Sequence, residues 1–214
     1  MMMKCILAAA VGAALAGSAS AATVVNGGFE EPGTFSGGWA TYGVGSTAIT
    51  GWEIEAGDVD LINTYWQHAE GSYSLDLGGN VGARISQTVT GLVTGADYIL
   101  NFALAGNPDG PPTIKMVEAA VGATAQTFSF DITGRTLTDM GWIYQALPFV
   151  AEAESMLLRF TSIDPPLGEA GGFYGPALDD VSIRLAPIPL PAAGWLMLAG
   201  LGGLAALRRR RTAA

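Results

Sequence analysis

Short runs of β-forming residues, separated by glycine-rich turns, repeat along most of this 214-residue chain. In several runs apolar and polar side chains alternate, as at 98–104 and 181–185, which places the apolar ones on a single face of a strand. Between residues 23 and 186 no stretch has the periodicity of an amphipathic helix. About ten to twelve short strands in one chain are typical of a sandwich. We therefore predict an all-β fold: a two-sheet antiparallel β-sandwich of the jelly-roll kind.

The expected strands lie between two apolar ends of the chain. A chain of this size buries roughly 70% of the surface of its unfolded state, so we expect one domain over residues 22–186 that needs no disulfide. The expected strands are 23–25, 47–50, 52–55, 59–62, 73–77, 83–89, 98–104, 114–121, 127–132, 143–150, 156–162 and 177–185.

Residues 1–21 have the pattern of a secretory signal peptide. Lys4 gives a basic start, an apolar run follows, and Ala19-Ser20-Ala21 matches a cleavage site, so we expect cleavage after Ala21. Cys5 is the only cysteine of the chain and lies inside this segment. The mature chain is therefore expected to lack disulfides, thiolate metal sites and a cysteine nucleophile.

The C-terminal tail, residues 187–214, predicts a membrane anchor. Positions 192–207 are uncharged, and as a helix they would extend about 24 Å. An arginine cluster follows this run and favours a cytoplasmic end, with the domain outside. We therefore expect contact with the membrane through a C-terminal transmembrane helix. The arginines are Arg208, Arg209, Arg210 and Arg211.

The tail as a whole resembles the PEP-type sorting signals of Gram-negative bacteria, in the variant with a Val-Pro-Leu-Pro-Ala box. This resemblance implies an exosortase-type membrane protease as partner, removal of the tail, and transport to the cell surface or extracellular matrix. The box in this chain is Ile188, Pro189, Leu190, Pro191 and Ala192.

Charge is distributed unevenly along the chain. Residues 22–186 contain all 19 acidic residues and only five of the ten basic ones, which gives this segment a net charge of −14. Such a surface repels phosphate backbones, so we expect no nucleic-acid partner. It is compatible with calcium and with neutral sugars.

Four short motifs follow one another along the expected domain. They are V-N-G-G-F-E at 25–30, G-S-Y-S-L-D-L-G at 71–78, R-I-S-Q-T-V-T-G at 84–91 and G-P-A-L-D-D-V-S at 175–182. In this order they resemble the choice-of-anchor C family of bacterial surface proteins and the related plant cell-wall proteins of a domain of unknown function. The resemblance implies a galactose-binding-like sandwich and a non-catalytic surface domain with a possible role in glycan binding.

The first and last motifs also resemble those of carbohydrate-binding modules, in which they hold a structural calcium ion. This resemblance implies Ca²⁺ as a cofactor, with Glu30, Asp179 and Asp180 as ligands. Strand alternation groups Asp180 with Ser182 on the outer side, so we expect Asp180 to be the better ligand of the pair. The alternative is that the two aspartates only form a turn.

Aromatic side chains are the candidates for stacking on sugar rings. Trp52 and Trp142 begin β-runs, so we expect them in the core. A loop-like stretch combines two rings with an amide and an imidazole, and we predict the ligand site there, with a solvent-facing Trp66 as the stacking platform. The alternative is a loop that packs its own aromatics. The predicted site residues are Tyr65, Trp66, Gln67 and His68, and the other candidate rings are Trp39 and Tyr174.

Catalysis has little support in the sequence. His68 is the only histidine, and no Gly-x-Ser-x-Gly elbow occurs in the mature chain. Carboxylates two residues apart, as at 53/55, 58/60 and 152/154, are what a glycosidase would require, but they also fit solvated strand edges. We therefore expect a non-catalytic surface or matrix protein that binds extracellular polysaccharide. The alternatives are a purely structural or adhesive protein and an extracellular glycan hydrolase.

Overall fold

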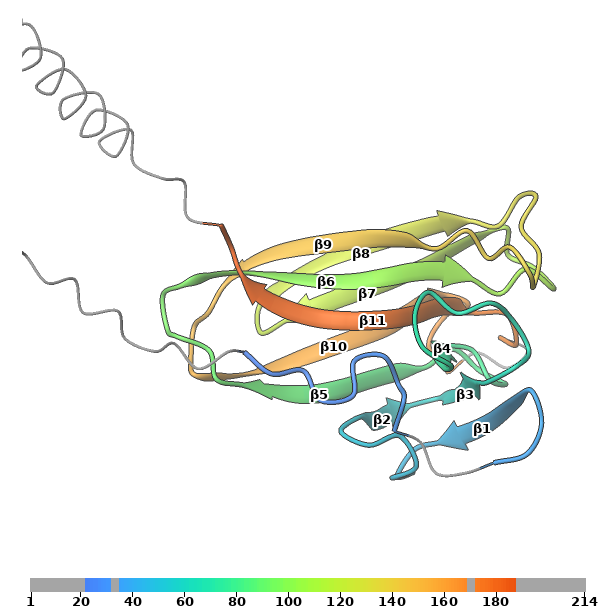
Figure 1. Cartoon of the computed structure of the whole chain (residues 1–214), viewed down its shortest axis with the longest axis horizontal. Helices are drawn as coiled ribbons and strands as arrows, with labels where there is room; N and C mark the ends of the chain where they lie inside the picture. Colours follow the sequence, from blue (N-terminus) through green and yellow to red (C-terminus); the bar gives the residue numbers. More distant parts are fainter. Residues whose placement is uncertain (1–21, 32–34, 169–171, 188–214) are drawn as a thin grey trace, which may run out of the picture.

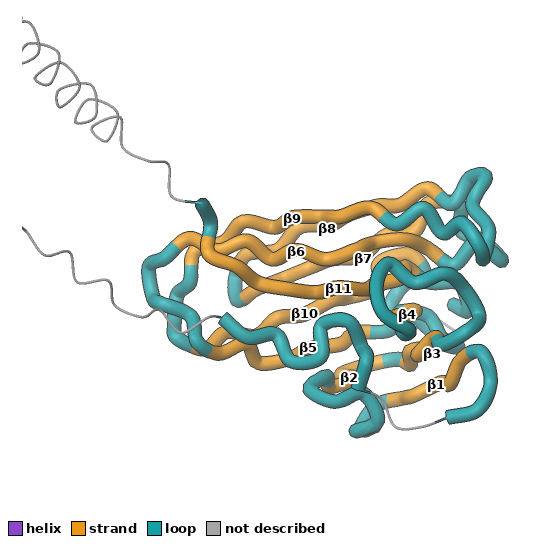
Figure 2. The backbone as a smooth tube through the Cα atoms, viewed as in Figure 1, coloured by secondary structure: helices purple, strands orange, loops and turns teal. Residues whose placement is uncertain are grey.

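Strands and loops make up the part of the chain that the computed structural model describes, which is residues 22–31, 35–168 and 172–187; this part contains no helix (Figure 2). The strands form two antiparallel sheets that pack face to face (Figure 1). The predicted all-β two-sheet sandwich is thus confirmed. The strands are β1 Trp39–Gly43, β2 Glu53–Ala56, β3 Asp58–Ile62, β4 Ser74–Asp76, β5 Arg84–Thr90, β6 Asp97–Gly106, β7 Ile114–Val121, β8 Thr124–Asp131, β9 Ile143–Val150, β10 Ser155–Asp164 and β11 Pro176–Leu185.

The larger sheet has the strand order β1-β3-β4-β11-β6-β9, and the smaller has the order β2-β5-β10-β7-β8. The long strand β11 therefore lies between β4 and β6, although it comes last in the sequence. Its pairing with β6 is broken between Asp179 and Ser182, where the register shifts and Asp180 has a φ of 45°. A left-handed residue within a strand is characteristic of a β-bulge.

Alternating side chains of β6 and β10 fill the space between the sheets. Tyr98 and Phe102 of β6 are fully buried, as the alternation predicts. The Phe102 ring lies 5.2 Å from that of Phe128 and 5.0 Å from that of Phe160, in edge-to-face contacts. Such contacts add to the burial of apolar area that stabilises the sandwich.

The strands expected at 23–25 and 47–50 do not form, and the prediction missed one strand, β1. Residues 23–25 form a single bridge, Thr23 to Thr90, and residues 47–50 lead into a turn at Gly51, whose φ is 81°. Strand β1 is half exposed and lies between glycine-containing turns, so its apolar pattern is weak. It is held by antiparallel pairing with β3, which no local pattern encodes.

Both described ends of the domain lie beside the turn that joins β5 to β6. The N–H of Thr23 donates to the carbonyl of Thr90, and the N–H of Ala186 donates to the carbonyl of Asp97. None of the described residues belongs to a helix long and apolar enough to cross a membrane. The predicted signal peptide and the sorting signal with its box and arginine cluster lie outside the described residues.

Trp52 is 4% exposed, which confirms its predicted core position. Its ring lies 5.5 Å from that of Phe29 and 6.2 Å from that of Phe160, and its Nε1–H donates to the carbonyl of Asn26 at 3.0 Å. Trp142 is only partly buried at the edge of the core, because its indole N–H reaches out to the carbonyl of Gln67.

Replacement of Trp52 by alanine is expected to lower the free energy of unfolding by about 3–5 kcal/mol, as large core truncations do. Trp39, which is 49% exposed, is the matched control, and Trp39→Ala should change stability little. Urea unfolding followed by circular dichroism measures both. Equal stabilities of the two variants would contradict this account of the core.

Candidate functional site

The loop between β3 and β4 contains the predicted ligand residues, but it does not present Trp66 to solvent. The Trp66 side chain is 4% exposed, and its Nε1–H donates to the Ser74 hydroxyl at 2.7 Å. The expectation of a solvent-facing stacking platform at Trp66 is therefore wrong. Ser74 supplies a buried acceptor for the indole, so the ring can lie in the core without an unpaired N–H.

Gln67 and His68 form hydrogen bonds that hold this loop in place. His68 contacts the Ser74 hydroxyl through Nδ1 at 2.9 Å and the carbonyl of Asn63 through Nε2. Gln67 Oε1 accepts from the N–H of Met140 at 3.2 Å, and the Gln67 carbonyl accepts the indole N–H of Trp142 at 2.8 Å. These contacts give both side chains a structural role in this conformation.

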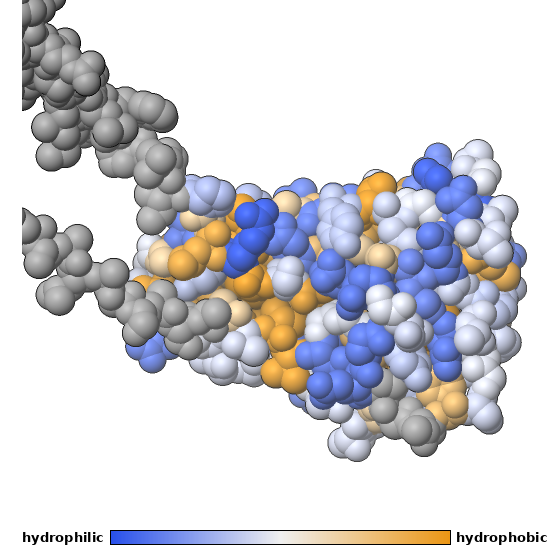
Figure 3. Space-filling view, viewed as in Figure 1, coloured by the Kyte–Doolittle hydropathy of each residue, from blue (hydrophilic) through white to orange (hydrophobic). Residues whose placement is uncertain are grey.

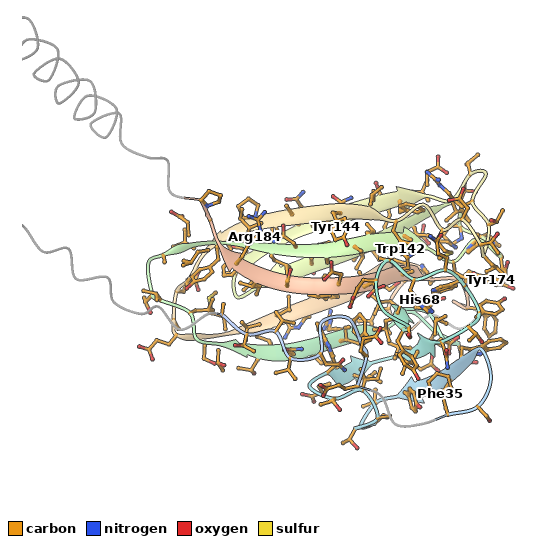
Figure 4. The ribbon with its side chains drawn as sticks, in the orientation of Figure 1. Phe35, His68, Trp142, Tyr144, Tyr174 and Arg184 are labelled. Atoms are coloured by element: carbon orange, nitrogen blue, oxygen red, sulfur yellow. The ribbon has the colours of Figure 1, made fainter. Side chains whose placement is uncertain are left out.

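Tyr65, one of the four predicted ligand residues, lines a hollow. A groove of about 340 Å³ lies beside it, at the end of the sandwich that holds Tyr174 and away from Arg184 (Figure 4). The exposed Trp39 ring of β1 meets the Tyr65 ring edge-on at 4.8 Å. Phe173, 48% exposed, and Tyr174 reach the groove from the segment before β11. The lining residues are Trp39, Thr41, Asp60, Ile62, Tyr65, Gly79, Asn80, Asn107, Phe173 and Tyr174.

Hydrogen-bonding side chains lie between these rings. Thr41 Oγ1 donates to Asp60 Oδ1 at 2.5 Å, and the Tyr65 hydroxyl donates to Asp109. The bond to Asp109 raises the pKa of Tyr65 to about 12, so this hydroxyl stays protonated and oriented. Burial raises the pKa of Asp60, and repulsion from Asp58 adds to this effect. The groove thus combines aromatic faces with hydroxyl, amide and carboxyl groups.

No local pattern in the sequence marks several of these residues. Phe173, Asn80 and Asn107 stand in separate loops, and Asp60 is conspicuous only as half of a carboxylate pair. They meet because β1, β3 and β4 are neighbours in the larger sheet and the 172–175 segment runs directly into β11. Long-range pairing, rather than any local motif, assembles the groove.

A second hollow, of about 490 Å³, lies over β2, β5 and β10. Ser46, Thr47, Ser86 and Thr88 are among its lining residues, and its one ring belongs to the buried Trp52. A wall without an exposed aromatic face offers less to the apolar side of a ligand. The groove at Trp39 is therefore the better candidate site.

The predicted calcium ligands lie near one another, together with a fourth acidic residue that sequence reasoning missed, Glu70. Burial, followed by repulsion from Asp180 and Glu30, raises the pKa of Glu70. Glu30 Oε1 accepts the N–H groups of Ser72 at 2.7 Å and of Tyr73 at 2.9 Å. We call Glu30, Glu70, Asp179 and Asp180 the acidic cluster. In the view of Figure 3, hydrophilic residues cover much of the surface around β4.

The two aspartates of the acidic cluster differ in burial, as strand alternation predicts, although the register shifts beside them. Asp179 is fully buried, and its Oδ2 accepts the N–H groups of Ala69 at 2.9 Å and Glu70 at 3.1 Å. Burial nevertheless raises the pKa of Asp179 to about 7. Asp180 is partly exposed and accepts the hydroxyl of Tyr144 at 2.9 Å. The prediction that Asp180 lies on the outer side with Ser182, and Asp179 on the inner side, is thus confirmed.

Two observations bear on whether the acidic cluster suits a cation. A side chain at position 28 would collide with the Glu70 carboxylate, and one at position 71 would collide with that of Glu30, so glycines keep both carboxylates close to the backbone. No basic side chain of the described residues forms a salt bridge with the cluster. Within this part of the chain, however, no three acidic or histidine side chains converge as a metal site, so a bound ion would also need backbone oxygens.

Residues 22–184 match a protein family described as "Protein of unknown function (DUF642)". The chain belongs to the DUF642 family. The predicted relation to proteins of a domain of unknown function is thereby confirmed for the larger part of the chain.

One curated relative of this DUF642 chain is halomucin of Haloquadratum walsbyi (strain DSM 16790 / HBSQ001), with 34% identity over 188 residues. The alignment covers 85% of this chain, which spans 2% of the length of halomucin. Similar solved structures include a family 35 carbohydrate binding module from Clostridium thermocellum, with 18% identity and a TM-score of 0.41 over 69% of this chain and 92% of that one. The CBM22-1 xylan-binding domain from Paenibacillus barcinonensis has 17% identity and a TM-score of 0.42 over 69% and 91% of the two chains.

Replacement of Ser74 by alanine in this DUF642 domain should lower the free energy of unfolding by about 1–3 kcal/mol, since it leaves the buried indole N–H of Trp66 without an acceptor. The control is Ser72→Ala, because Ser72 is exposed and uses only its backbone N–H in the contact with Glu30. Urea denaturation of both variants measures the difference. If Ser74→Ala is as stable as Ser72→Ala, Trp66 is not held in the way described.

Proposed function

We propose that this domain binds extracellular carbohydrate without catalysis, through the groove beside Trp39 and Tyr65. The observation that carries the proposal is the pair of exposed rings, Trp39 and Phe173, in one groove with polar side chains such as those of Asp60 and Asn107. Sugars present apolar C–H faces and a rim of hydroxyls. Aromatic faces suit the former, and a few fixed polar groups suit the latter.

The polar groups of the groove are already oriented by the protein. Thr41 holds Asp60, and Asp58 holds the side chain of Asn80 through a 2.8 Å bond. A site ordered before binding loses less side-chain entropy when the ligand arrives. The ligand class favoured by charge is neutral glycan, because residues 22–186 have a net charge of −14 and repel polyanions.

A glycan hydrolase is the less favoured alternative. Glycosidases place two carboxyl groups on either side of the scissile bond. Of the described residues that line the groove, Asp60 alone contributes a carboxyl group. Two other carboxylates of the expected pairs have partners of their own: Glu55 lies 3.2 Å from Arg159 in a salt bridge, and Asp58, the partner of Asp60 in its pair, accepts the backbone N–H groups of Asn80 and Val81. Binding without turnover is what this arrangement supports.

The proposal places the domain outside the cytoplasm, either anchored by the C-terminal tail or released by an exosortase-type protease. The support for this part is the sequence pattern of the signal peptide and of the tail. A protein located there would meet extracellular polysaccharide. A purely structural or adhesive role is the outcome if the groove binds no glycan.

Trp39→Ala should weaken binding to a neutral polysaccharide by about tenfold or more, since aromatic anchors dominate binding energy. The fold should persist, because the ring is half exposed. Tyr144→Ala is the matched control: it removes another exposed ring, which lies on β9 and outside the groove. Isothermal titration against a panel of neutral polysaccharides measures the affinities, and reducing-sugar assays on the same mixtures test for turnover.

Two results would reject the proposal. One is the absence of binding by the parent domain to any member of the panel. The other is equal binding by the parent and Trp39→Ala. Release of reducing sugar by the parent but not by Asp60→Asn would favour the hydrolase instead.

We also propose that the acidic cluster holds a structural Ca²⁺ ion. Glu30 and Asp180 would provide carboxylate oxygens, with Glu70 and Asp179 beside them. Burial and, to a smaller extent, repulsion from Asp180 and Glu30 raise the pKa of Glu70, and a divalent cation would relieve the repulsion. The ion would fasten the start of the domain to the bulge of β11 and take no part in glycan contact.

An ion that binds only the folded domain stabilises it, by about 2.7 kcal/mol at a concentration one hundred times its Kd. Chelation should therefore lower the melting temperature, and added Ca²⁺ should restore it. Glu30→Gln should remove this response, whereas Glu31→Gln, at the next position, should keep it. A parent domain that melts at one temperature with and without chelator would show that the cluster holds no calcium.

A further inference from the structure

Two opposite charges are buried behind the groove. Lys115 of β7 and Asp76 of β4 are both 0% exposed, although charged groups are rarely buried so completely. They come from different sheets, since β7 belongs to the smaller sheet and β4 to the larger one. Neither residue lines the groove itself.

The Lys115 ammonium connects two loops. Its Nζ donates to the carbonyl of Gly110 at 2.8 Å and to the carbonyl of Tyr174 at 2.6 Å, and it lies 5.9 Å from the centre of the Tyr174 ring. The side-chain stem of Lys115 passes over Gly106, where a Cβ atom would collide with it. Because residue 106 is a glycine, the Lys115 stem has the space that it needs for its ammonium to reach the loops.

Asp76 connects the same two loops through their donors. Its Oδ2 accepts the side-chain N–H of Asn107 at 2.9 Å, and its Oδ1 accepts the N–H of Gly175 at 2.9 Å. A Cβ at position 175 would collide with Oδ1, so a glycine is needed for this approach. The N–H of Gly78 gives the carboxylate a third bond, at 2.9 Å.

Each charged side chain thus bonds to both segments, 107–110 and 174–175. Lys115 bonds to their carbonyl acceptors, and Asp76 bonds to their N–H donors. These segments carry Asn107 and Tyr174, which line one side of the groove. We infer that Asp76 and Lys115 are positioning residues: together they fix the loops that carry Asn107 and Tyr174, and ligand affinity depends on both charges. This inference rests on the proposed function for its ligand, but not for the behaviour of the loops.

The charge states of the pair are sensitive to their surroundings. Burial lowers the pKa of Lys115 to about 8, while Asp76 and Asp164 of β10 oppose this effect. Burial raises the pKa of Asp76 well above its ordinary value, against the bond from Asn107; Asp60 of β3 adds to the increase. The titratable neighbours on the groove side are Tyr65, Asp109 and Tyr174.

Because the pKa of Lys115 is lower in the fold than in the unfolded chain, the unfolded chain binds more protons between about pH 8 and pH 10.5. Loss of the Lys115 proton therefore favours the folded state as the pH rises through this window. The same loss weakens the bonds to the two carbonyls, since a charged donor binds about twice as strongly as a neutral one. Affinity and stability should change in opposite directions.

The test uses Lys115→Met, which keeps the stem and removes the ammonium, and the double variant Asp76→Asn/Lys115→Met, which leaves no unpaired buried charge. Glu55→Gln is the control, because Glu55 belongs to an ion pair with Arg159 at 3.2 Å on the smaller sheet, away from the groove. Affinity for the neutral polysaccharide that the parent binds is measured from pH 7 to pH 9.5. Melting temperatures are measured over the same range, and hydrogen–deuterium exchange reports on the Asp109 and Gly175 amides.

We expect the parent to lose affinity above about pH 8 without a lower melting temperature. Both Lys115 variants should bind about tenfold more weakly at pH 7, with no further change up to pH 9.5, and should exchange the two amides faster. The double variant should melt closer to the parent than Lys115→Met does. Glu55→Gln should match the parent in every measurement.

Parent-like affinity and exchange in the double variant would overturn the inference, as would a pH profile shared by the parent and Lys115→Met. If the parent binds no glycan, the proposed function fails and the exchange data alone decide. Faster exchange at Asp109 and Gly175 then still supports the loop-fixing role, and unchanged exchange refutes it.

Discussion

The antiparallel pairing of β11 with β6 is the interaction on which both candidate sites depend. It joins the last strand of the domain to the middle of the larger sheet, with β4 on the other side. The segment before β11 places Tyr174 in the groove, and the bulge within β11 places Asp179 and Asp180 in the acidic cluster. A single strand therefore positions residues for two different purposes. Because β6 and β11 are far apart in the sequence, neither site exists until this long-range pairing has formed.

Strand alternation predicts the sandwich but not its sites. The pattern correctly gives the bounds of β7 and β9 and the buried faces of β6, because every second side chain of a strand must face the core. It also holds at Asp179, which is buried, and at Asp180, which is partly exposed, although a bulge interrupts the pairing there. It fails for Trp39 and Trp66, which stand in equally polar surroundings in the sequence. A buried hydroxyl at Ser74 decides which of the two rings is covered, and that contact comes from the next strand.

The charged residues of the domain have two different roles. Most acidic side chains lie at the surface, where they determine which ligands can approach. Asp76 and Lys115 are buried, and each is satisfied by backbone or amide groups rather than by water. Apolar side chains of similar size would often stabilise a fold as well as a buried charge pair does. The bonds of this pair instead define where two loops lie, which apolar contacts do less specifically.

The chain ends and the groove lie at opposite ends of strand β6. The two described chain ends lie beside Thr90 and Asp97, at the two sides of the turn that leads into β6, whereas Asn107, at the groove, directly follows the last residue of that strand. Ten residues of extended chain separate these points, a span of about 30 Å. The two packed sheets keep the groove at a fixed distance from the chain ends. A tether at either end of the domain would hold the sandwich by its base, and the aromatic rings would face outward at the full reach of the molecule, free of the surface to which the chain is attached.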